Sequence, residues 1–206
     1  MTPRPPVTAF LGLGGNVGDA VETLASAVYA LHDSDGIAVE DVSGIYETPP
    51  WGPVEQAPFA NCVVRIRTTL DPRELLLECQ TTEAAYGRDR EAEERWGPRP
   101  LDIDLLLYGD ETVDTPELTI PHPRLAERAF ALVPLLEVFP GGTLPDGRRL
   151  TRLLLDLGPI EDMDLIVRLE EVPGQHVARP EIHGGGGAYL AEEWHARGRP
   201  DPPPPD

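Results

Sequence analysis

Apolar runs and helical periodicity divide the first half of the chain into four predicted strands and two predicted helices. Residues 7–13 are apolar and end in a glycine-rich turn, which is typical of a strand. Three later segments have the same character: 37–46, 59–69 and 101–108. Helical spacing of apolar residues fits the segments between them, so the predicted order is strand, helix, strand, strand, helix, strand.

Both predicted helices have clear start signals. Asp19 is expected to cap the first helix, which runs to about residue 31 and has four apolar residues on one face: Val21, Leu24, Val28 and Leu31. Asp71 is expected to cap the second helix, with Pro72 at its first position, and this helix runs to about residue 86.

The order βαββαβ predicts a ferredoxin-like α+β fold, an antiparallel sheet with both helices on one face. An extra helix around residues 130–139 and a hairpin turn at 145–147 are expected to follow this core. We predict one domain over residues 1–158. Residues 159–206 are rich in glycine and proline, which predicts a partly disordered appendage, although residues 164–169 could add one more strand.

Composition excludes several classes of function. The 36 acidic residues outnumber the 17 basic ones, and the net charge of -19 argues against nucleic-acid binding. No apolar run approaches the roughly 20 residues of a membrane span. Every basic residue is Arg, so mechanisms that need a P-loop Lys or a Schiff-base Lys are excluded. Cys62 and Cys79 lack CxxC spacing and are typical of core residues in a reducing compartment, which predicts a cytoplasmic protein.

Two carboxylates mark the start of the last predicted strand. Asp102 and Asp104 share one face of it, because alternate side chains of a strand point the same way, and apolar residues occupy the other face. Buried carboxylates need compensating charge. Magnesium carried in by phosphate groups is one compensation, since Mg²⁺ prefers oxygen ligands. Ion pairing with nearby arginines is the other, and the strand pattern alone does not decide between them.

Four arginines precede this strand within twelve residues: Arg88, Arg90, Arg95 and Arg99. Guanidinium groups match phosphate oxygens in bidentate fashion, so beside two carboxylates they indicate a polyphosphate-binding site for phosphoryl transfer. The alternative for the arginines alone is a solvated loop neutralised by the acidic residues among them: Asp89, Glu91, Glu93 and Glu94.

Two further sets of residues are candidates for ligand contacts. Residues 12–18 resemble a nucleotide-binding glycine loop, but Val17 breaks the GxGxxG pattern. Aromatic and amide side chains suited to a flat heteroaromatic ring occur at four positions: Trp51, Phe59, Asn61 and Phe130. Core packing is the alternative for the aromatic residues. His122, between two prolines, is a structural residue or a ligand contact.

Residues 95–106, Arg-Trp-Gly-Pro-Arg-Pro-Leu-Asp-Ile-Asp-Leu-Leu, closely resemble the signature of the 6-hydroxymethyl-7,8-dihydropterin pyrophosphokinase family of folate biosynthesis. Supporting matches occur in the family's order, at residues 14–16, 46–53, 59–61, 121–122 and 128–130. The resemblance covers roughly residues 7–158, and it implies the same ferredoxin-like fold.

The resemblance also implies an activity, which is transfer of the β,γ-pyrophosphoryl group of ATP to the pterin hydroxymethyl oxygen, leaving AMP. Asp102 and Asp104 are then expected to bind two magnesium ions, with Arg88 and Arg99 as further catalytic residues. The expected pterin contacts are Thr48, Pro49, Trp51, Phe59, Asn61 and Phe130. The expected ATP contacts are Gln80, Glu83, Arg90, Arg95, Trp96, Ile103, His122 and Arg128.

Small-molecule substrates, with no nucleic acid or membrane partner, and a monomeric state are expected. The alternative is a non-catalytic nucleotide or pterin sensor on the same fold. A degenerate member of the family is expected to have lost the two aspartates, whereas this chain keeps Asp102 and Asp104.

Overall fold

The computed structural model describes residues 4–50, 54–90, 97–160, 162–169 and 172–173. The strands are β1 Val7–Gly15, β2 Ile37–Val42, β3 Ile45–Thr48, β4 Phe59–Thr68, β5 Asp102–Tyr108, β6 Val113–Asp114, β7 Thr119–Ile120 and β8 Asp164–Val167. The helices are α1 Ala20–Asp33, α2 Pro72–Ala85, α3 Ala129–Val138 and α4 Leu150–Asp156, with a 3-10 turn at Leu125–Glu127.

An antiparallel sheet forms the middle layer, in the order β5-β1-β4-β3-β8, and β2 pairs with β4 beside β3. The predicted combination of helices with an antiparallel sheet is thus confirmed. The strand predicted over residues 37–46 is two strands, because the regular ladder is interrupted at Ser43. There the Ser43 hydroxyl, in place of a backbone carbonyl, accepts the hydrogen bond from Val63 N at 2.9 Å.

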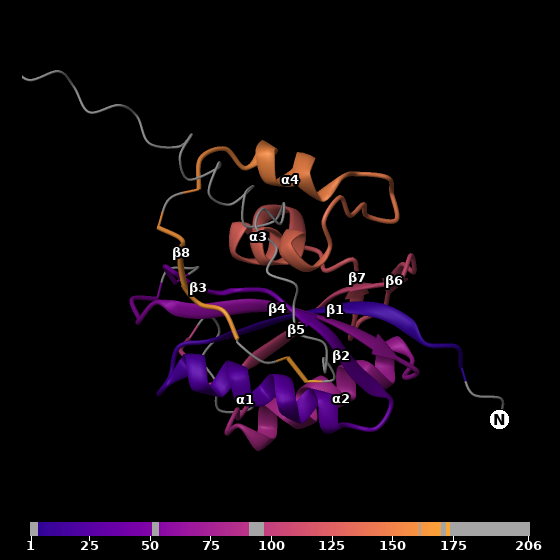
Figure 1. The fold of residues 1–206 in the computed structure, drawn as a ribbon, viewed down its shortest axis with the longest axis horizontal. Helices are drawn as coiled ribbons and strands as arrows, with labels where there is room; N and C mark the ends of the chain where they lie inside the picture. The colour runs from indigo at the N-terminus through magenta and orange to yellow at the C-terminus, as the bar shows by residue number, and fades with distance from the viewer. Residues whose placement is uncertain (1–3, 51–53, 91–96, 161, 170–171, 174–206) are drawn as a thin grey trace, which may run out of the picture.

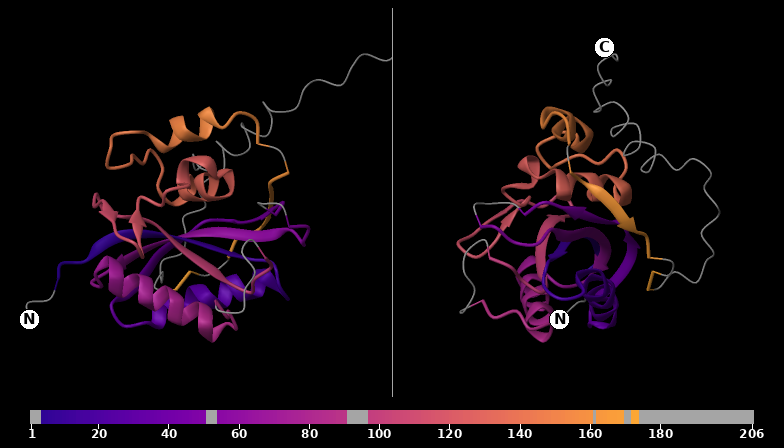
Figure 2. Two further views of the ribbon diagram at one scale, coloured as in Figure 1. Left: turned by 180° about the vertical axis from the view of Figure 1, so that it is seen from behind. Right: turned by 90° about the vertical axis from the view of Figure 1, so that its left-hand side faces the viewer.

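Helices cover both faces of this sheet (Figures 1 and 2). The two predicted helices, α1 and α2, pack on one face around a core that includes Leu24 and Leu75. On the other face, α3 and α4 enclose a second core that includes Leu132 and Leu154. Among the helices in the described part of the chain, none is long and apolar enough to cross a membrane.

The start signals of α1 and α2 are confirmed. Asp19 accepts a hydrogen bond from Glu22 N at 3.0 Å, which satisfies a donor at the start of α1. Asp71 and Glu74 form a capping box at α2, with Pro72 in the first turn. Cys62 and Cys79 are buried, as expected of core residues, and burial raises the pKa of the Cys62 thiol to about 12.

The chain after β5 contains more structure than the sequence patterns predicted. The extra helix is α3, and the hairpin turn is closed by a bridge between Thr143 and Arg149. The short pair β6–β7 and helix α4 had not been predicted. Within the predicted appendage, β8 pairs with β3, and Met163 and Val172 are buried. This part packs with the folded unit. Residues 174–206 lie outside the described residues, and the domain boundary after 158 stays a prediction.

Candidate active site

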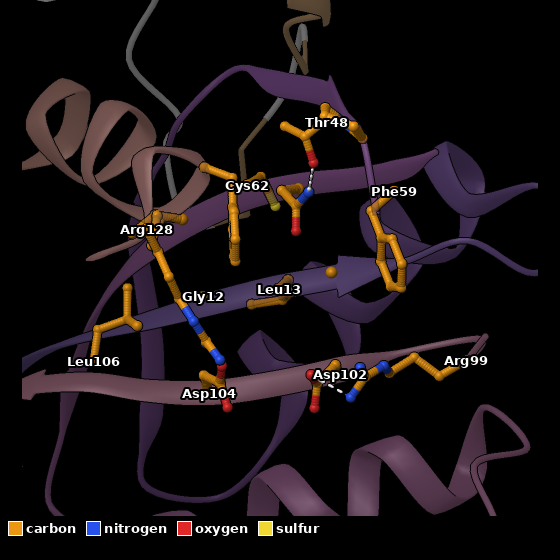
Figure 3. Close-up of a pocket in the computed structure, with 16 residues that line it drawn as sticks. Gly12, Leu13, Thr48, Phe59, Cys62, Arg99, Asp102, Asp104, Leu106 and Arg128 are labelled. Carbon is orange, nitrogen blue, oxygen red and sulfur yellow. Dashed lines mark hydrogen bonds and ion pairs between the residues drawn. The ribbon is translucent and has the colours of Figure 1, made fainter. Parts of the chain in front are cut away.

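Asp102 and Asp104 point from one face of β5 into a pocket (Figure 3). Their side chains are 24% and 35% exposed, whereas Ile103 between them is buried in the core on the α1–α2 side. The strand alternation predicted from the sequence is therefore present. The pocket is bounded by β1, β3, β4, β5 and the start of α3, and its lining includes Gly12, Gly14, Thr48, Pro49, Phe59, Asn61, Arg99, Asp102, Asp104, Arg128 and Phe130.

Arginines neutralise both carboxylates. Asp102 accepts hydrogen bonds from Arg88 and Arg99, the latter at 3.0 Å. Asp104 accepts one from Arg128 at 2.9 Å. Ion pairing, one of the two alternatives for these carboxylates, is thus present in the structure. These ion pairs do not exclude cation binding. A cation can replace the arginines beside the carboxylates, and phosphate groups can replace the carboxylates beside the arginines.

Two of the same arginines lie over the aromatic rings of the pocket. The Arg99 guanidinium carbon is 5.7 Å from the Phe59 ring centroid, and that of Arg128 is 5.5 Å from the Phe130 ring centroid. These distances are typical of cation–π contacts. Both rings line the pocket and are only half-buried. Phe130 also packs against the second core, so core packing, the alternative for the aromatic residues, is present in part for this ring.

Asn61 and Thr48 form a polar wall between the rings. Asn61 Nδ2 donates to Thr48 Oγ1 at 2.8 Å, and both side chains are buried in the pocket lining. Gly14 on β1 leaves room for this amide, since a Cβ there would lie 2.7 Å from Asn61 Oδ1. Such fixed donors and acceptors between apolar surfaces suit the edge of a heterocyclic ring.

Glu83 on α2 joins the arginine segment to the free edge of β5. Its buried carboxylate accepts a hydrogen bond from Ile103 N at 2.7 Å and also binds Arg88 and Arg90. Burial raises the pKa of Glu83, and the two guanidinium groups oppose that shift. A second hollow on this side is lined by Gln80, Glu83, Ala84, Gly87, Arg88, Asp89 and Arg90.

The arginines differ in their surroundings. Arg88 has a side chain only 7% exposed, so the alternative of a solvated loop is wrong for this residue. Arg90 is 48% exposed but pairs with Glu83. The predicted contacts Trp51, Arg95 and Trp96 lie outside the described residues.

His122 has the structural role that the sequence allowed, whereas its contact with a ligand stays a prediction. Its backbone N donates to Leu106 O at 2.9 Å, which holds the loop against β5. Its Nε2 lies 3.8 Å from Asp104 Oδ2, at the rim of the carboxylate pair. Burial lowers the pKa of His122, and Asp104 only partly opposes this, so the imidazole is neutral at pH 7.

Asn16 is a site residue whose role the sequence reasoning missed. Its backbone N donates to Arg99 O at 3.0 Å, and its Oδ1 accepts from Arg99 N at 2.9 Å. Its Nδ2 binds Gln56 Oε1 and Ala57 O, each at 3.0 Å. Gly15 permits this close approach, because a Cβ there would lie 2.3 Å from Pro100 O. The sequence signals were an Asn directly after two glycines at a strand end and the match of residues 14–16 to the family, and neither indicated a contact with Arg99.

The chain matches known proteins over most of the described fold. The sequence model of 7,8-dihydro-6-hydroxymethylpterin-pyrophosphokinase (HPPK) matches residues 10–140. The 2-amino-4-hydroxy-6-hydroxymethyldihydropteridine pyrophosphokinase of Bacillus subtilis (strain 168) is 47% identical over 130 residues, covering 63% of this chain and 77% of that protein. The protein of the same name from Methylorubrum extorquens is 49% identical over 132 residues, covering 64% of this chain and 82% of that protein.

Solved structures share the fold at low sequence identity. The structure of wild-type HPPK-DHPS from Plasmodium falciparum superposes with a TM-score of 0.58 at 15% identity. The match covers 76% of this chain and 45% of that one, so the chain spans less than half of the larger protein. With the family match over residues 10–140 and relatives at 47–49% identity, the chain belongs to the 7,8-dihydro-6-hydroxymethylpterin-pyrophosphokinase (HPPK) family.

Proposed function

We propose that this protein transfers pyrophosphate from ATP to 6-hydroxymethyl-7,8-dihydropterin in folate biosynthesis. The pterin hydroxymethyl oxygen attacks the β-phosphorus of ATP and loses its proton to water. The bond from this phosphorus to the oxygen that bridges it to the α-phosphorus breaks, and AMP leaves with that oxygen. The products are AMP and the pterin diphosphate, and no covalent enzyme intermediate is needed.

One observation carries this proposal beyond family membership. Asp102 and Asp104 open into the same pocket as the polar wall of Asn61 and Thr48 and the rings of Phe59 and Phe130. Two carboxylates with adjoining arginines suit a polyphosphate, whereas two rings with an amide between them suit a planar heterocycle. Both substrates of the proposed reaction thus find suitable chemistry within one site.

Asp102 and Asp104 would hold the magnesium of the reaction, and we propose two ions. The donors fit, because both are carboxylates that open from one face of β5 into the same pocket. Two carboxylates leave the remaining coordination positions to phosphate oxygens and water, as Mg²⁺ prefers. The chemistry that magnesium would supply there is neutralisation of phosphate charge and orientation of the attacking oxygen.

The protein side chains then bind and position the substrates. We propose that Phe59 and Phe130 stack on the pterin, that Asn61, Thr48 and Pro49 contact its edge, and that Trp51 adds to this side. Arg88 and Arg99 face the phosphates, because both already reach the carboxylate of Asp102. The remaining proposed ATP contacts are Gln80, Glu83, Arg90, Arg95, Trp96, Ile103, His122 and Arg128.

Ile103 is the least direct of these contacts. Its side chain is 3% exposed, and its backbone N is bound to Glu83. Any contact of Ile103 with ATP therefore has to come from its backbone. Catalysis in this scheme rests on positioning and charge neutralisation.

The test is incubation of the protein with ATP, magnesium and the reduced pterin alcohol. We expect AMP and pterin diphosphate in equal amounts, and no AMP when the pterin is omitted. Binding of either ligand without AMP formation would instead favour a sensor. The same reaction with Asp104→Asn provides the matched control for a contaminating kinase.

The ferredoxin-like topology, the cellular location and the oligomeric state are also proposals. A ferredoxin-like core is supported by the order β5-β1-β4 with β2 and β3 along the far side of β4, and by α1 and α2 on one face. We also propose that the protein is cytoplasmic and monomeric. Light scattering of the purified protein tests the monomeric state. A dimeric mass would contradict the monomer.

A further inference from the structure

A partly buried ion pair outside the pocket joins the segment of β8 to α3. The Glu137 side chain, on α3, is 7% exposed and accepts two hydrogen bonds from Arg168, which directly follows β8. Arg168 Nη1 donates to Oε2 at 2.8 Å, and Nη2 donates to Oε1 at 3.1 Å. Arg168 lies beyond residues 10–140, the part that the family model matches. The pair is thus built partly from a segment outside that match.

The same carboxylate also holds the strand segment around β3. Gly44 N donates to Glu137 Oε2 at 2.8 Å, and the Tyr46 hydroxyl donates to Oε1. Burial alone would raise the pKa of Glu137, but the hydrogen bonds from Arg168 and Tyr46 outweigh it and place the pKa below its ordinary value. Glu137 is therefore a buried carboxylate with Arg168 as its charged partner.

β8 is fitted closely against β3. Tyr46 pairs with Leu165, and Ile45 pairs with Val167, in antiparallel register. A Cβ at Gly44 would lie 2.3 Å from the Leu165 side chain, so glycine at this position allows the approach of β8. The ion pair and the strand pairing together fix β8 to the edge of the sheet.

This junction lies next to the elements that form the pterin side of the pocket. Tyr46 is the direct cross-strand partner of Asn61, and it precedes Thr48 by two residues on the same strand. Glu137 follows Phe130 by seven residues, about two turns along α3. A displacement of α3 relative to β3 therefore changes the separation between Phe130 and the Asn61–Thr48 wall.

We propose that Arg168 is a positioning residue for the pterin subsite, acting through Glu137. By neutralising that carboxylate it keeps α3 and β3 in one arrangement, which sets the width of the pocket between Phe130 and Asn61. The inference rests on the proposed function for the identity of the ligand. Residues 163–169 thus contribute to the geometry of the site, although none of them lines the pocket.

The experiment compares ligand affinities of the full-length chain and its variants by calorimetry. One titration uses a non-hydrolysable ATP analogue with magnesium, and a second adds the reduced pterin alcohol to the complex. For Arg168→Ala we expect about tenfold weaker pterin binding, with affinity for the analogue changed by less than about twofold. Arg168→Lys, which keeps the positive charge, should recover part of the loss. Arg152→Ala is the matched control, because the Arg152 side chain is 74% exposed and pairs with Asp156 along α4.

Equal weakening of both ligands would indicate general damage and would overturn the positioning role. Unchanged pterin affinity with a lowered melting temperature would also overturn it, leaving Arg168 as a stabilising residue only. If Arg168→Ala does not fold, Glu137→Gln keeps the side-chain shape and should show the same pterin-selective loss. A wild-type protein that forms no AMP and binds no pterin contradicts the proposed function itself. Failure of the proposed function is thus distinguished from failure of the positioning role of Arg168, which is measured in the variants.

Discussion

Arg128 donates a hydrogen bond to Asp104 at 2.9 Å, and its guanidinium also lies 5.5 Å from the Phe130 ring centroid. One arginine therefore contacts both a proposed magnesium ligand and a proposed pterin-stacking ring. Arg99 makes the equivalent pair of contacts, with Asp102 and Phe59. Under the proposed function, binding of magnesium, ATP and pterin would exchange these contacts, with the arginines turning to phosphates as the carboxylates receive the cations.

Asp102→Asn and Asp104→Asn should each fold and lose activity by at least about 100-fold, because preorganised charge is removed from the reacting phosphates. Both side chains are partly exposed, so little stability depends on them. Rates of AMP formation at saturating magnesium measure the effect. Asp146→Asn is the control, because Asp146 pairs with Arg148 at the hairpin turn and does not line the pocket of Asp102 and Asp104. Near wild-type turnover of either active-site variant would remove the aspartates from the catalytic assignment.

Phe130→Ala should weaken pterin binding by about 1–3 kcal/mol with little effect on the ATP analogue, since it removes one stacking surface. Phe139→Ala is the matched control. Phe139 ends the same helix but stacks on Phe10, with ring centroids 4.7 Å apart. Calorimetry should find the pterin-selective loss only in the first variant. The same loss in both would mean that core packing of α3, and not stacking on the ligand, explains the effect.

Asn16→Ala should lower activity by about tenfold or more, because Arg99 loses a hydrogen bond that fixes its backbone beside Asp102. Stability should fall by about 1–2 kcal/mol. Asn16→Asp keeps the acceptor for Arg99 N but loses the donor to Gln56 and Ala57. We expect it to retain more activity than the Ala variant, as measured by initial rates. An Ala variant with unchanged kcat would show that the Asn16 contacts serve stability alone.

The lowered pKa of Glu137 predicts that the stability of the fold decreases in acid. Its pKa is lowered in the folded protein, so the ionised carboxylate stabilises the fold above the unfolded-state value of 4.5, and this contribution is lost as pH falls through the folded-state pKa. Glu137→Gln lacks this proton linkage. The melting temperature of the wild type should therefore fall more steeply than that of the variant between about pH 6 and about pH 3. Parallel curves would contradict the charged state assigned to Glu137.

Two truncations separate β8 from the residues after it. A chain ending at residue 160 loses β8 and Arg168, whereas one ending at residue 173 keeps both. We expect the shorter chain to melt at a clearly lower temperature, because the buried Glu137 carboxylate loses its charged partner. Thermal denaturation of the two proteins under one set of conditions measures the difference. Equal melting temperatures would show that β8 contributes nothing to the stability of the sheet.

Local sequence patterns were sufficient to predict several features of the fold and of the site. The alternation around Ile103 predicted that Asp102 and Asp104 share a face, because side-chain direction follows directly from strand geometry. The caps at Asp19 and Asp71 were likewise visible, since capping depends on residues within one turn. The residue types also singled out the aromatic and amide positions, and the resemblance to the family implied their role as pterin contacts. These features depend on neighbours along the chain.

Only the tertiary structure decided which distant groups meet. The contacts of Asn16 with Arg99, and of Glu137 with Tyr46 and Arg168, join segments that no periodicity relates. Local patterns also gave no partner for Asp104, which pairs with Arg128 across 24 residues of sequence. Hydrogen bonds and ion pairs of this kind depend on how the elements pack together. The sequence by itself therefore determined the chemical character of the site. The packing of α3 against the sheet and the pairing of β8 with β3 decided which charged and polar groups contact one another.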